Sequence, residues 1–159
     1  MTKSFLLALI IFAFSFSAFA QDNADVKKDQ EAIKKVIQSA YVDGLQNEGN
    51  FDKIDKGFHP GFNLLGIGRV NEIWKLPIYT WKESTKKKLK EGTLPKKDKN
   101  KIVSVKFLNV DVTGTAAVAK IEFYVGKKLT YVDYLSLYKF EDGWKIVSKI
   151  FYKFPEKKD

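Results

Sequence analysis

The last third of the chain, Lys101–Phe154, alternates between hydrophobic and polar positions in four successive runs. Side chains of a strand point alternately to its two faces, so this alternation predicts four β-strands. Turn sequences such as Thr113-Gly114, Gly126-Lys127 and Glu141-Asp142-Gly143 separate the runs. Because parallel pairing needs long crossovers, these short connections favour an antiparallel meander.

The hydrophobic phase changes within the first of these runs. Val103 and Val105 share one phase, whereas Leu108 and Val110 fall in the other. An extra residue in one strand of an antiparallel pair shifts the phase in this way and bends the strand. The sequence therefore predicts a β-bulge near Lys106–Leu108 and a bent sheet.

Two polar residues in the later runs could reach the interior. Asp133 shares a face with Leu129, Leu135 and Leu137, but alternation alone does not decide whether that face is covered or solvated. In the last run, Lys149 alternates with apolar positions and shares a face with two other lysines, Lys145 and Lys153. We interpret this lysine face as solvated, and a functional role for Lys149 is the alternative.

Helical periodicity precedes the strands. Apolar residues recur at three- and four-residue spacing over Asp22–Glu48, which predicts an amphipathic first helix. A short second helix is predicted over Phe51–Lys56, a short strand over Asn63–Ile67, and a third helix from Pro77 to about Lys90. Helices followed by an antiparallel sheet indicate an α+β domain.

The N-terminus has the pattern of a signal peptide. Lys3 precedes an apolar run over Phe5–Phe16, and the small-x-small sequence Ala18-Phe19-Ala20 follows. The run is shorter than the roughly 20 residues that a transmembrane helix needs. We therefore expect residues 1–20 to be a signal peptide, residues 21–159 to form a single domain, and the mature protein to be periplasmic or secreted.

Composition narrows the chemistry further. The chain has no cysteine and one histidine, which excludes disulfides and a zinc site built from His and Cys ligands. Gly66-Ile67-Gly68 lacks the third glycine of a dinucleotide fingerprint, so we expect no cofactor.

The formal charge is +9, with lysines concentrated over Lys82–Lys101. Solubility is the default explanation of that stretch, and contact with a membrane or another anionic partner is the alternative. We expect no nucleic-acid partner.

His59 and Asp133 are the candidates for acid–base catalysis. A carboxylate facing a cavity loses hydration, and this loss can raise its pKa toward the range of a general base. His59 precedes Pro60, so the alternative is a histidine held at a turn. No complete catalytic set can be assigned from these residues.

A predicted pocket would lie between the helices and the sheet. Aromatic residues at regular spacing can line such a pocket or form ordinary core. The residues we expect to line it are Tyr41, Phe58, His59, Phe62, Trp81, Phe123, Tyr131, Asp133 and Leu135.

Four segments resemble a known family: Tyr41–Gly44, Gly57–Pro60, Asp133–Leu137 and Gly143–Lys149. Together they are similar to the "putative lumazine-binding" family of the nuclear transport factor 2-like (NTF2-like) superfamily, whose other members include ketosteroid-isomerase-like proteins. The resemblance implies a cone-shaped half-barrel, with three N-terminal helices packed on a strongly bent antiparallel sheet around a pocket. It also implies a homodimer formed through the sheet.

Three functions are compatible with these features. The first is a non-catalytic, exported protein that binds a small apolar or aromatic molecule. The second is an isomerase, dehydratase or cyclase in which Asp133 or His59 acts as the base and Tyr41 or Tyr131 donates to an oxyanion. The third is an interaction module whose outer sheet face, with Tyr134 and Tyr138, forms a homodimer.

Overall fold

Six strands form a single sheet in the order β2-β1-β6-β5-β4-β3. The computed structural model describes residues 24–98 and 100–155. The strands are β1 (Phe58–Ile67), β2 (Ile73–Pro77), β3 (Val103–Thr113), β4 (Ala116–Val125), β5 (Lys128–Phe140) and β6 (Gly143–Lys153). The last four pair antiparallel in sequence order, which confirms the predicted meander.

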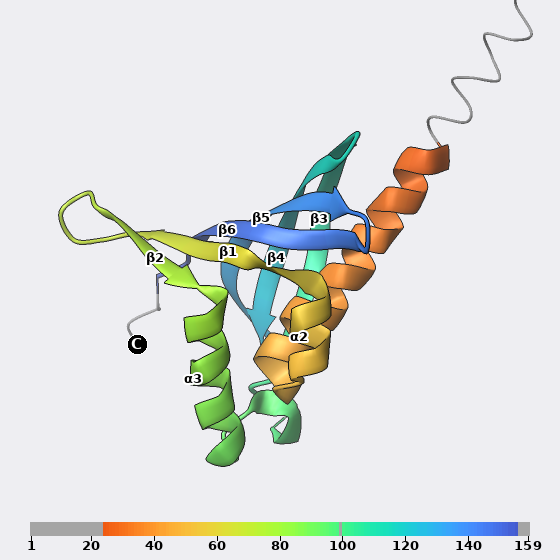
Figure 1. Ribbon diagram of the computed structural model, residues 1–159. Helices are drawn as coiled ribbons and strands as arrows, with labels where there is room; N and C mark the ends of the chain where they lie inside the picture. Colours follow the sequence, from red (N-terminus) through yellow and green to blue (C-terminus); the bar gives the residue numbers. More distant parts are fainter. Residues whose placement is uncertain (1–23, 99, 156–159) are drawn as a thin grey trace, which may run out of the picture.

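The helices lie on one side of this curved, unclosed sheet (Figure 1). The first helix is α-helical over residues 24–36 and continues as the π-helix η1 (Ile37–Glu48). It is followed by α2 (Phe51–Gly57), while α3 (Ile78–Lys90) and the short 3-10 turn η2 (Pro95–Lys97) precede β3. This arrangement confirms the α+β half-barrel with three helices packed on a bent sheet.

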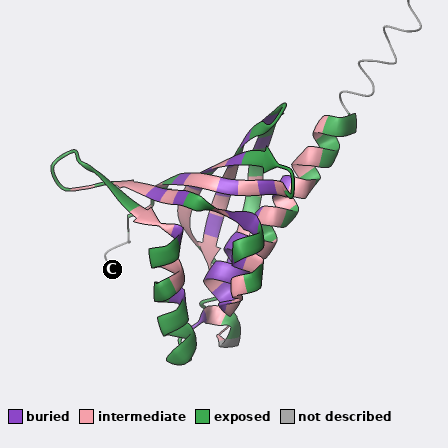
Figure 2. Ribbon diagram, in the orientation of Figure 1, coloured by how far each residue is buried: buried purple, intermediate pink, exposed green. Residues whose placement is uncertain are grey.

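The core lies between the first helix and the inner face of the sheet, where Figure 2 shows the buried residues concentrated. The helix contributes Ile33, Ile37 and Leu45, spaced so that they share one stripe. The sheet contributes alternate residues of β4 and β5, because their side chains point to one face at period two. These include Ala119, Ile121, Phe123, Leu135 and Leu137.

The second helix begins with a capping hydrogen bond. The side chain of Asn50 accepts from the backbone N–H of Lys53, which satisfies one of the donors left free at a helix start. Gly57 ends α2 against the first helix, and a Cβ built on Gly57 would lie 2.3 Å from Cβ of Ala40. The absence of a side chain at Gly57 lets α2 pack directly against the first helix at Ala40.

The strands before α3 are longer than predicted. The expected strand over Asn63–Ile67 is part of β1, which begins at Phe58, and β2 adds an antiparallel edge that the sequence analysis does not predict. β1 also runs parallel to β6, with Leu64 opposite Lys149. The sheet therefore joins an early segment of the chain to its last strand.

Bulges interrupt the pairing of the sheet, and those in β3 and β6 bear on the site. In β3 the register shifts between Phe107 and Asn109, which leaves Leu108 unpaired and confirms the predicted bulge. In β6 the register passes from Ile146 directly to Ser148, so Val147 is an extra residue. This second bulge reverses the phase of β6, because Trp144 and Ile146 face the core before it and Lys149 does so after it.

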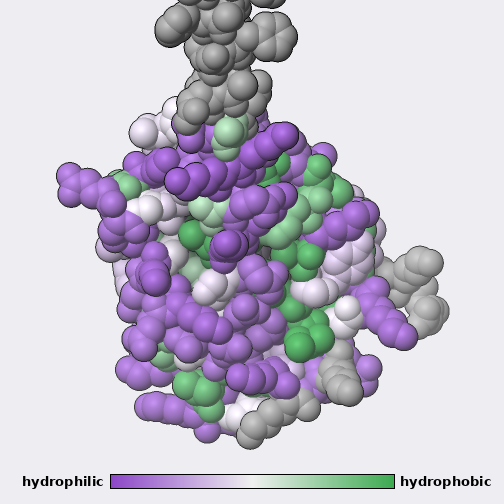
Figure 3. All heavy atoms as spheres, turned by 90° about the vertical axis from the view of Figure 1, so that its right-hand side faces the viewer, coloured by the Kyte–Doolittle hydropathy of each residue, from purple (hydrophilic) through white to green (hydrophobic). Residues whose placement is uncertain are grey.

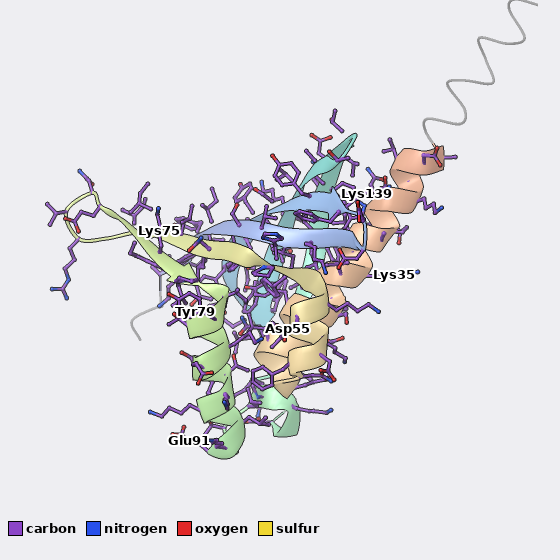
Figure 4. All side chains as sticks on the ribbon, in the orientation of Figure 1. Lys35, Asp55, Lys75, Tyr79, Glu91 and Lys139 are labelled. Carbon is purple, nitrogen blue, oxygen red and sulfur yellow. The ribbon has the colours of Figure 1, made fainter. Side chains whose placement is uncertain are left out.

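The surface is predominantly polar. Hydrophilic side chains cover most of the face seen in Figure 3, and hydrophobic atoms form separate patches. Lys35 lies on the outer side of the first helix, and Lys139 of β5 lies beside that helix (Figure 4), where its Nζ is 2.8 Å from Oδ1 of Asp29.

No helix within residues 24–98 and 100–155 has the length and hydropathy needed to cross a bilayer. The predicted signal peptide, residues 1–20, lies outside the described residues.

Candidate ligand-binding pocket

A pocket of about 500 Å³ opens between the helices and the inner face of the sheet. Aromatic and aliphatic side chains dominate its wall, and a few polar groups interrupt it. The lining residues are Tyr41, Gln46, Leu64, Trp81, Pro95, Lys101, Val103, Phe123, Val125, Tyr131, Lys149, Phe151 and Lys153. A concave, mostly apolar site with few polar groups is typical of small-molecule binding.

Three buried polar residues form a cluster at this pocket. Nζ of Lys149 lies 2.7 Å from Oδ1 of Asp133 and donates a hydrogen bond of 2.8 Å to Oη of Tyr41. The Tyr41 hydroxyl in turn donates to Oδ2 of Asp133 over 2.8 Å. Asp133 is 0% exposed, Tyr41 1% and Lys149 5%, so each group relies on the other two for polar contacts.

Three different elements position this cluster. Tyr41 comes from η1, Asp133 from the middle of β5, and Lys149 from the part of β6 that follows the bulge at Val147. Leu135 is opposite Lys149 in the antiparallel pair, so Asp133 lies one inward-facing position away along the same face. The bulge is required because, without Val147, Lys149 would point to the outer face of the sheet.

Five aromatic rings surround the Lys149 ammonium group. Nζ lies between 5.1 and 6.0 Å from the ring centroids of Tyr41, Trp81, Phe123, Tyr131 and Phe151. Ring faces carry negative electrostatic potential and attract a cation at such distances. The cage therefore stabilises the charged form of Lys149 in an otherwise apolar wall.

Burial shifts the pKa values of Lys149 and Tyr41 in opposite directions, because in each case it disfavours the charged form. Loss of hydration lowers the pKa of Lys149, and the nearby Asp133 carboxylate opposes this change. Loss of hydration also raises the pKa of Tyr41 well above 10.0, and the charge and hydrogen bond of Asp133 raise it further. Tyr41 is therefore a hydroxyl that stays protonated and can donate a hydrogen bond at any physiological pH.

The contact between Lys149 and Asp133 is a close ion pair, with Nζ and Oδ1 2.7 Å apart. The Asp133 carboxylate attracts the ammonium group through its charge and through hydrogen bonding, and both effects oppose the lowering of the Lys149 pKa by burial. The close approach therefore holds Lys149 in place at the pocket.

The residues predicted to line the pocket fall into two layers. Tyr41, Trp81, Phe123 and Tyr131 lie on the pocket wall. Behind the wall, within the core, lie Phe58, Phe62 and Leu135, together with Asp133. Asp133 faces the interior, so the face of β5 that carries it is covered rather than solvated. It does not line the pocket itself and contacts it through Tyr41 and Lys149.

His59 lies outside this pocket. Its ring stacks on Phe140 at the end of β5, with centroids 4.9 Å apart and planes 11° apart. Its Nδ1 accepts a hydrogen bond from the backbone N–H of Gly61 over 3.0 Å. The structure therefore does not bring His59 to the cluster around Asp133, and it places His59 in β1 rather than at a turn.

The interpretation of Lys149 as part of a solvated face is wrong. Lys145 and Lys149 lie on opposite sides of the bulge in β6, so strict alternation does not relate them. Sequence reasoning also does not identify Phe151, which the same phase change turns into the pocket. The signal that could have revealed both is the interruption of alternation at Val147, the same kind of signal that identifies the bulge in β3.

The described residues contain no group of three or more His, Cys, Asp or Glu side chains suited to hold a metal ion.

Comparison with known families gives one match, to a family described as "Putative lumazine-binding", over residues 28–152. A search among functionally curated proteins gives no match.

Solved structures with a similar fold include NTF2-like proteins. One of unknown function from Shewanella baltica OS155 superposes with a TM-score of 0.61 at 21% identity, covering 81% of this chain and 96% of that one. One of unknown function from Methylobacillus flagellatus KT gives 0.59 at 21% identity, with coverages of 80% and 94%. A "putative dehydratase from the NTF2-like family" from Streptomyces avermitilis gives 0.55 at 12% identity, with coverages of 82% and 99%. At these identities the likeness concerns the fold.

Proposed function

The chain belongs to the "Putative lumazine-binding" family of NTF2-like proteins, and we propose that it binds a small, largely aromatic molecule in the pocket around Lys149 without transforming it. The observation that supports this function is the lining of the pocket. Flat rings of Trp81, Phe123, Tyr131 and Phe151 surround a volume of about 500 Å³, which falls in the range of ligand sites. Burial of ring faces against such a wall supplies affinity through the hydrophobic effect and ring packing.

The cluster behind the wall suits binding better than proton abstraction. Asp133 is the candidate base, but it is fully buried, ion-paired with Lys149 and hydrogen-bonded by Tyr41. A general base must reach the proton that it removes, directly or through one water. Lys149 and Tyr41 line the pocket instead. The single O–H of Tyr41 is donated to Asp133, so the group that can donate a hydrogen bond to a ligand is the ammonium of Lys149.

A thermal-shift screen with aromatic compounds tests this proposal, and two valines of β4 provide a matched pair of variants. Val125 lines the pocket, whereas Val118 is 46% exposed elsewhere on the strand. We expect Val125→Trp to fill the pocket and abolish the rise in melting temperature caused by a ligand, and Val118→Trp to preserve it. A rise that persists fully in Val125→Trp would place the ligand elsewhere and overturn the proposal.

We also propose that the outer face of the sheet forms a homodimer. Large apolar side chains on this face are exposed on neighbouring strands, namely Tyr134 and Tyr138 of β5 and Ile150 and Tyr152 of β6. Tyr134 is directly opposite Ile150 in the pairing of the two strands, so the exposed groups are contiguous. Contiguous exposed apolar residues on a sheet are typical of a protein–protein contact.

Export after removal of residues 1–20 is a further part of the proposal. It rests on the apolar run and the Ala18-Phe19-Ala20 sequence. Expression of the full chain in a bacterium, followed by fractionation and intact-mass measurement, tests it. A mature protein that begins at Gln21 in the periplasm or medium is expected, and an uncleaved chain in the cytoplasm would contradict export.

A further inference from the structure

We infer that the pocket selects aromatic molecules that carry an anionic group, and that Lys149 recognises this group. The inference rests on the proposed function, because it names the class of ligand that the pocket takes. It is carried by the charges of the lining, by the hydrogen-bonding state of the Lys149 ammonium group, and by the occupant of the aromatic cage.

The lining is positively charged. Lys101, Lys149 and Lys153 all line the pocket, and no Asp or Glu does so among the residues that the structure describes. For Lys149 and Lys101 the paired carboxylates lie outside the lining. Asp133 lies behind Lys149, and Asp98 pairs with Lys101 over 3.3 Å at an exposed position where solvent weakens the attraction. A ligand in the pocket therefore meets the ammonium groups of Lys149 and Lys101 directly, with these two carboxylates behind them.

The Lys149 ammonium group retains hydrogen-bonding capacity. An ammonium group has three N–H donors. Oη of Tyr41 accepts one of them over 2.8 Å, and Oδ1 of Asp133 lies 2.7 Å from Nζ, so these two partners leave one N–H group for a ligand. A carboxylate, sulfonate or phosphate oxygen of a ligand can accept a remaining donor, and charge-assisted hydrogen bonds of this kind are about twice as strong as neutral ones.

The aromatic cage argues against a cationic ligand. Cages of several aromatic rings bind ammonium ions, so the lining alone would suit a cation. In this protein Nζ of Lys149 already occupies the cage, within 6.0 Å of five ring centroids. A second cation beside it would be repelled, since like charges in a partly dehydrated site interact strongly. The same rings leave flat apolar surface for an uncharged aromatic body attached to an anion.

Three probes with one ring system test the inference in the mature protein. Naphthoate and naphthamide have nearly the same shape and differ in charge, and naphthylmethylammonium carries the opposite charge. We expect calorimetric titration at neutral pH to give naphthoate an affinity about tenfold or more above that of naphthamide, since hydrogen bonds to charged groups are the stronger class. Naphthylmethylammonium is expected to bind most weakly.

Two variants assign the preference to Lys149. The double variant Asp133→Asn/Lys149→Gln removes both charges of the pair together, so no uncompensated buried charge remains. We expect it to bind naphthoate and naphthamide with equal affinity. Lys87→Gln makes a change of one charge at a lysine of α3 that is 77% exposed and does not line the pocket, and we expect it to keep the full preference.

The outcomes separate this inference from the proposed function. Equal affinities of naphthoate and naphthamide for the unmodified protein would overturn the anion preference and leave the aromatic pocket standing. A preference that survives in the folded double variant would overturn the role of Lys149. If none of the three probes binds at millimolar concentration, both the inference and the proposed aromatic pocket are contradicted.

Discussion

Lys149 and Asp133 form an ion pair of 2.7 Å in which the lysine side chain is 6% exposed and the aspartate side chain 0% exposed. Both charges have left water, and each is compensated chiefly by the other and by Tyr41. The attraction in such a pair is partly cancelled by the cost of dehydration, so the pair as a whole adds little net stability. Removing one partner alone lowers stability strongly, because it leaves the other charge buried and uncompensated.

A double-mutant cycle on this pair follows from that asymmetry. We expect Lys149→Met alone to lower the free energy of unfolding by about 3–5 kcal/mol. The double variant Asp133→Leu/Lys149→Met should recover most of this loss, because the apolar wall accepts both side chains. Urea unfolding of the two single variants, the double variant and the parent measures the coupling, and equal losses in Lys149→Met and the double variant would contradict it.

Tyr41→Phe tests the hydroxyl that links the pair. It removes one hydrogen bond to Asp133 and one from Lys149, so we expect a loss of about 1–3 kcal/mol at neutral pH. The mutation adds no volume, and the ring keeps its tilted packing against Phe123. Urea unfolding at neutral pH measures the loss, and an unchanged free energy of unfolding would mean that the hydroxyl contributes nothing there.

The same variant makes a prediction about alkaline pH. The pKa of Tyr41 is raised by burial and by Asp133 above its ordinary value of 10.0, so the folded chain holds a proton that the unfolded chain loses. Stability from this group is complete below pH 10.0 and declines as pH rises toward the folded pKa. The advantage of the parent over Tyr41→Phe should therefore shrink above pH 10.0. An advantage that grows over that range would show the opposite sign of the pKa shift.

Gly57→Ala tests the contact between α2 and the first helix. The added Cβ would lie 2.3 Å from Cβ of Ala40, and neither group can rotate away. We expect a loss of about 1–3 kcal/mol, measured by chemical unfolding, because the two helices must separate. The compensating double variant Ala40→Gly/Gly57→Ala should recover part of it, reduced by about 1 kcal/mol for glycine inside a helix. No recovery would indicate that the clash lies elsewhere.

Ile150→Lys tests the proposed homodimer. Ile150 is 53% exposed on the outer face of β6. Sedimentation velocity of the mature parent at tens of micromolar should show a dimer, and a lysine introduced there should give monomers, because it places like charges at a symmetric contact. Tyr79→Lys makes a similar change on α3, where Tyr79 is 67% exposed, and should leave the dimer intact. A monomeric parent would contradict the proposal at once.

The sequence predicts most of the sheet because alternation and turn residues are local signals. The strands β3 to β6 are recovered for this reason, and the phase change at Leu108 locates one bulge. The strand β2 is missed, since its exposed side chains do not alternate between buried and solvated positions. The parallel pairing of β1 with β6 is missed as well, because it joins distant segments and has no local signature.

The site is less predictable than the fold, and two residues show why. Alternation places Asp133 with three leucines but cannot say which face the helices cover; that depends on long-range packing. For Lys149, alternation with Lys145 suggests a side chain that faces solvent. This prediction fails because the extra residue Val147 reverses the face of every later side chain in β6. The sequence predicts part of the aromatic wall. The position of the Lys149 ammonium group depends on the register of β6 against β5 in the folded sheet.

The pairing of β1 with β6 has a consequence for how the protein is made. Leu64 and Lys149 are neighbours in the sheet although most of the chain separates them, so the growing polypeptide cannot complete this contact until its final strand has been synthesised. A nascent chain that stops after β5 lacks the ammonium group and leaves β1 without its partner. The pocket wall that contains Leu64 and Lys149 is therefore complete only when β6 is present.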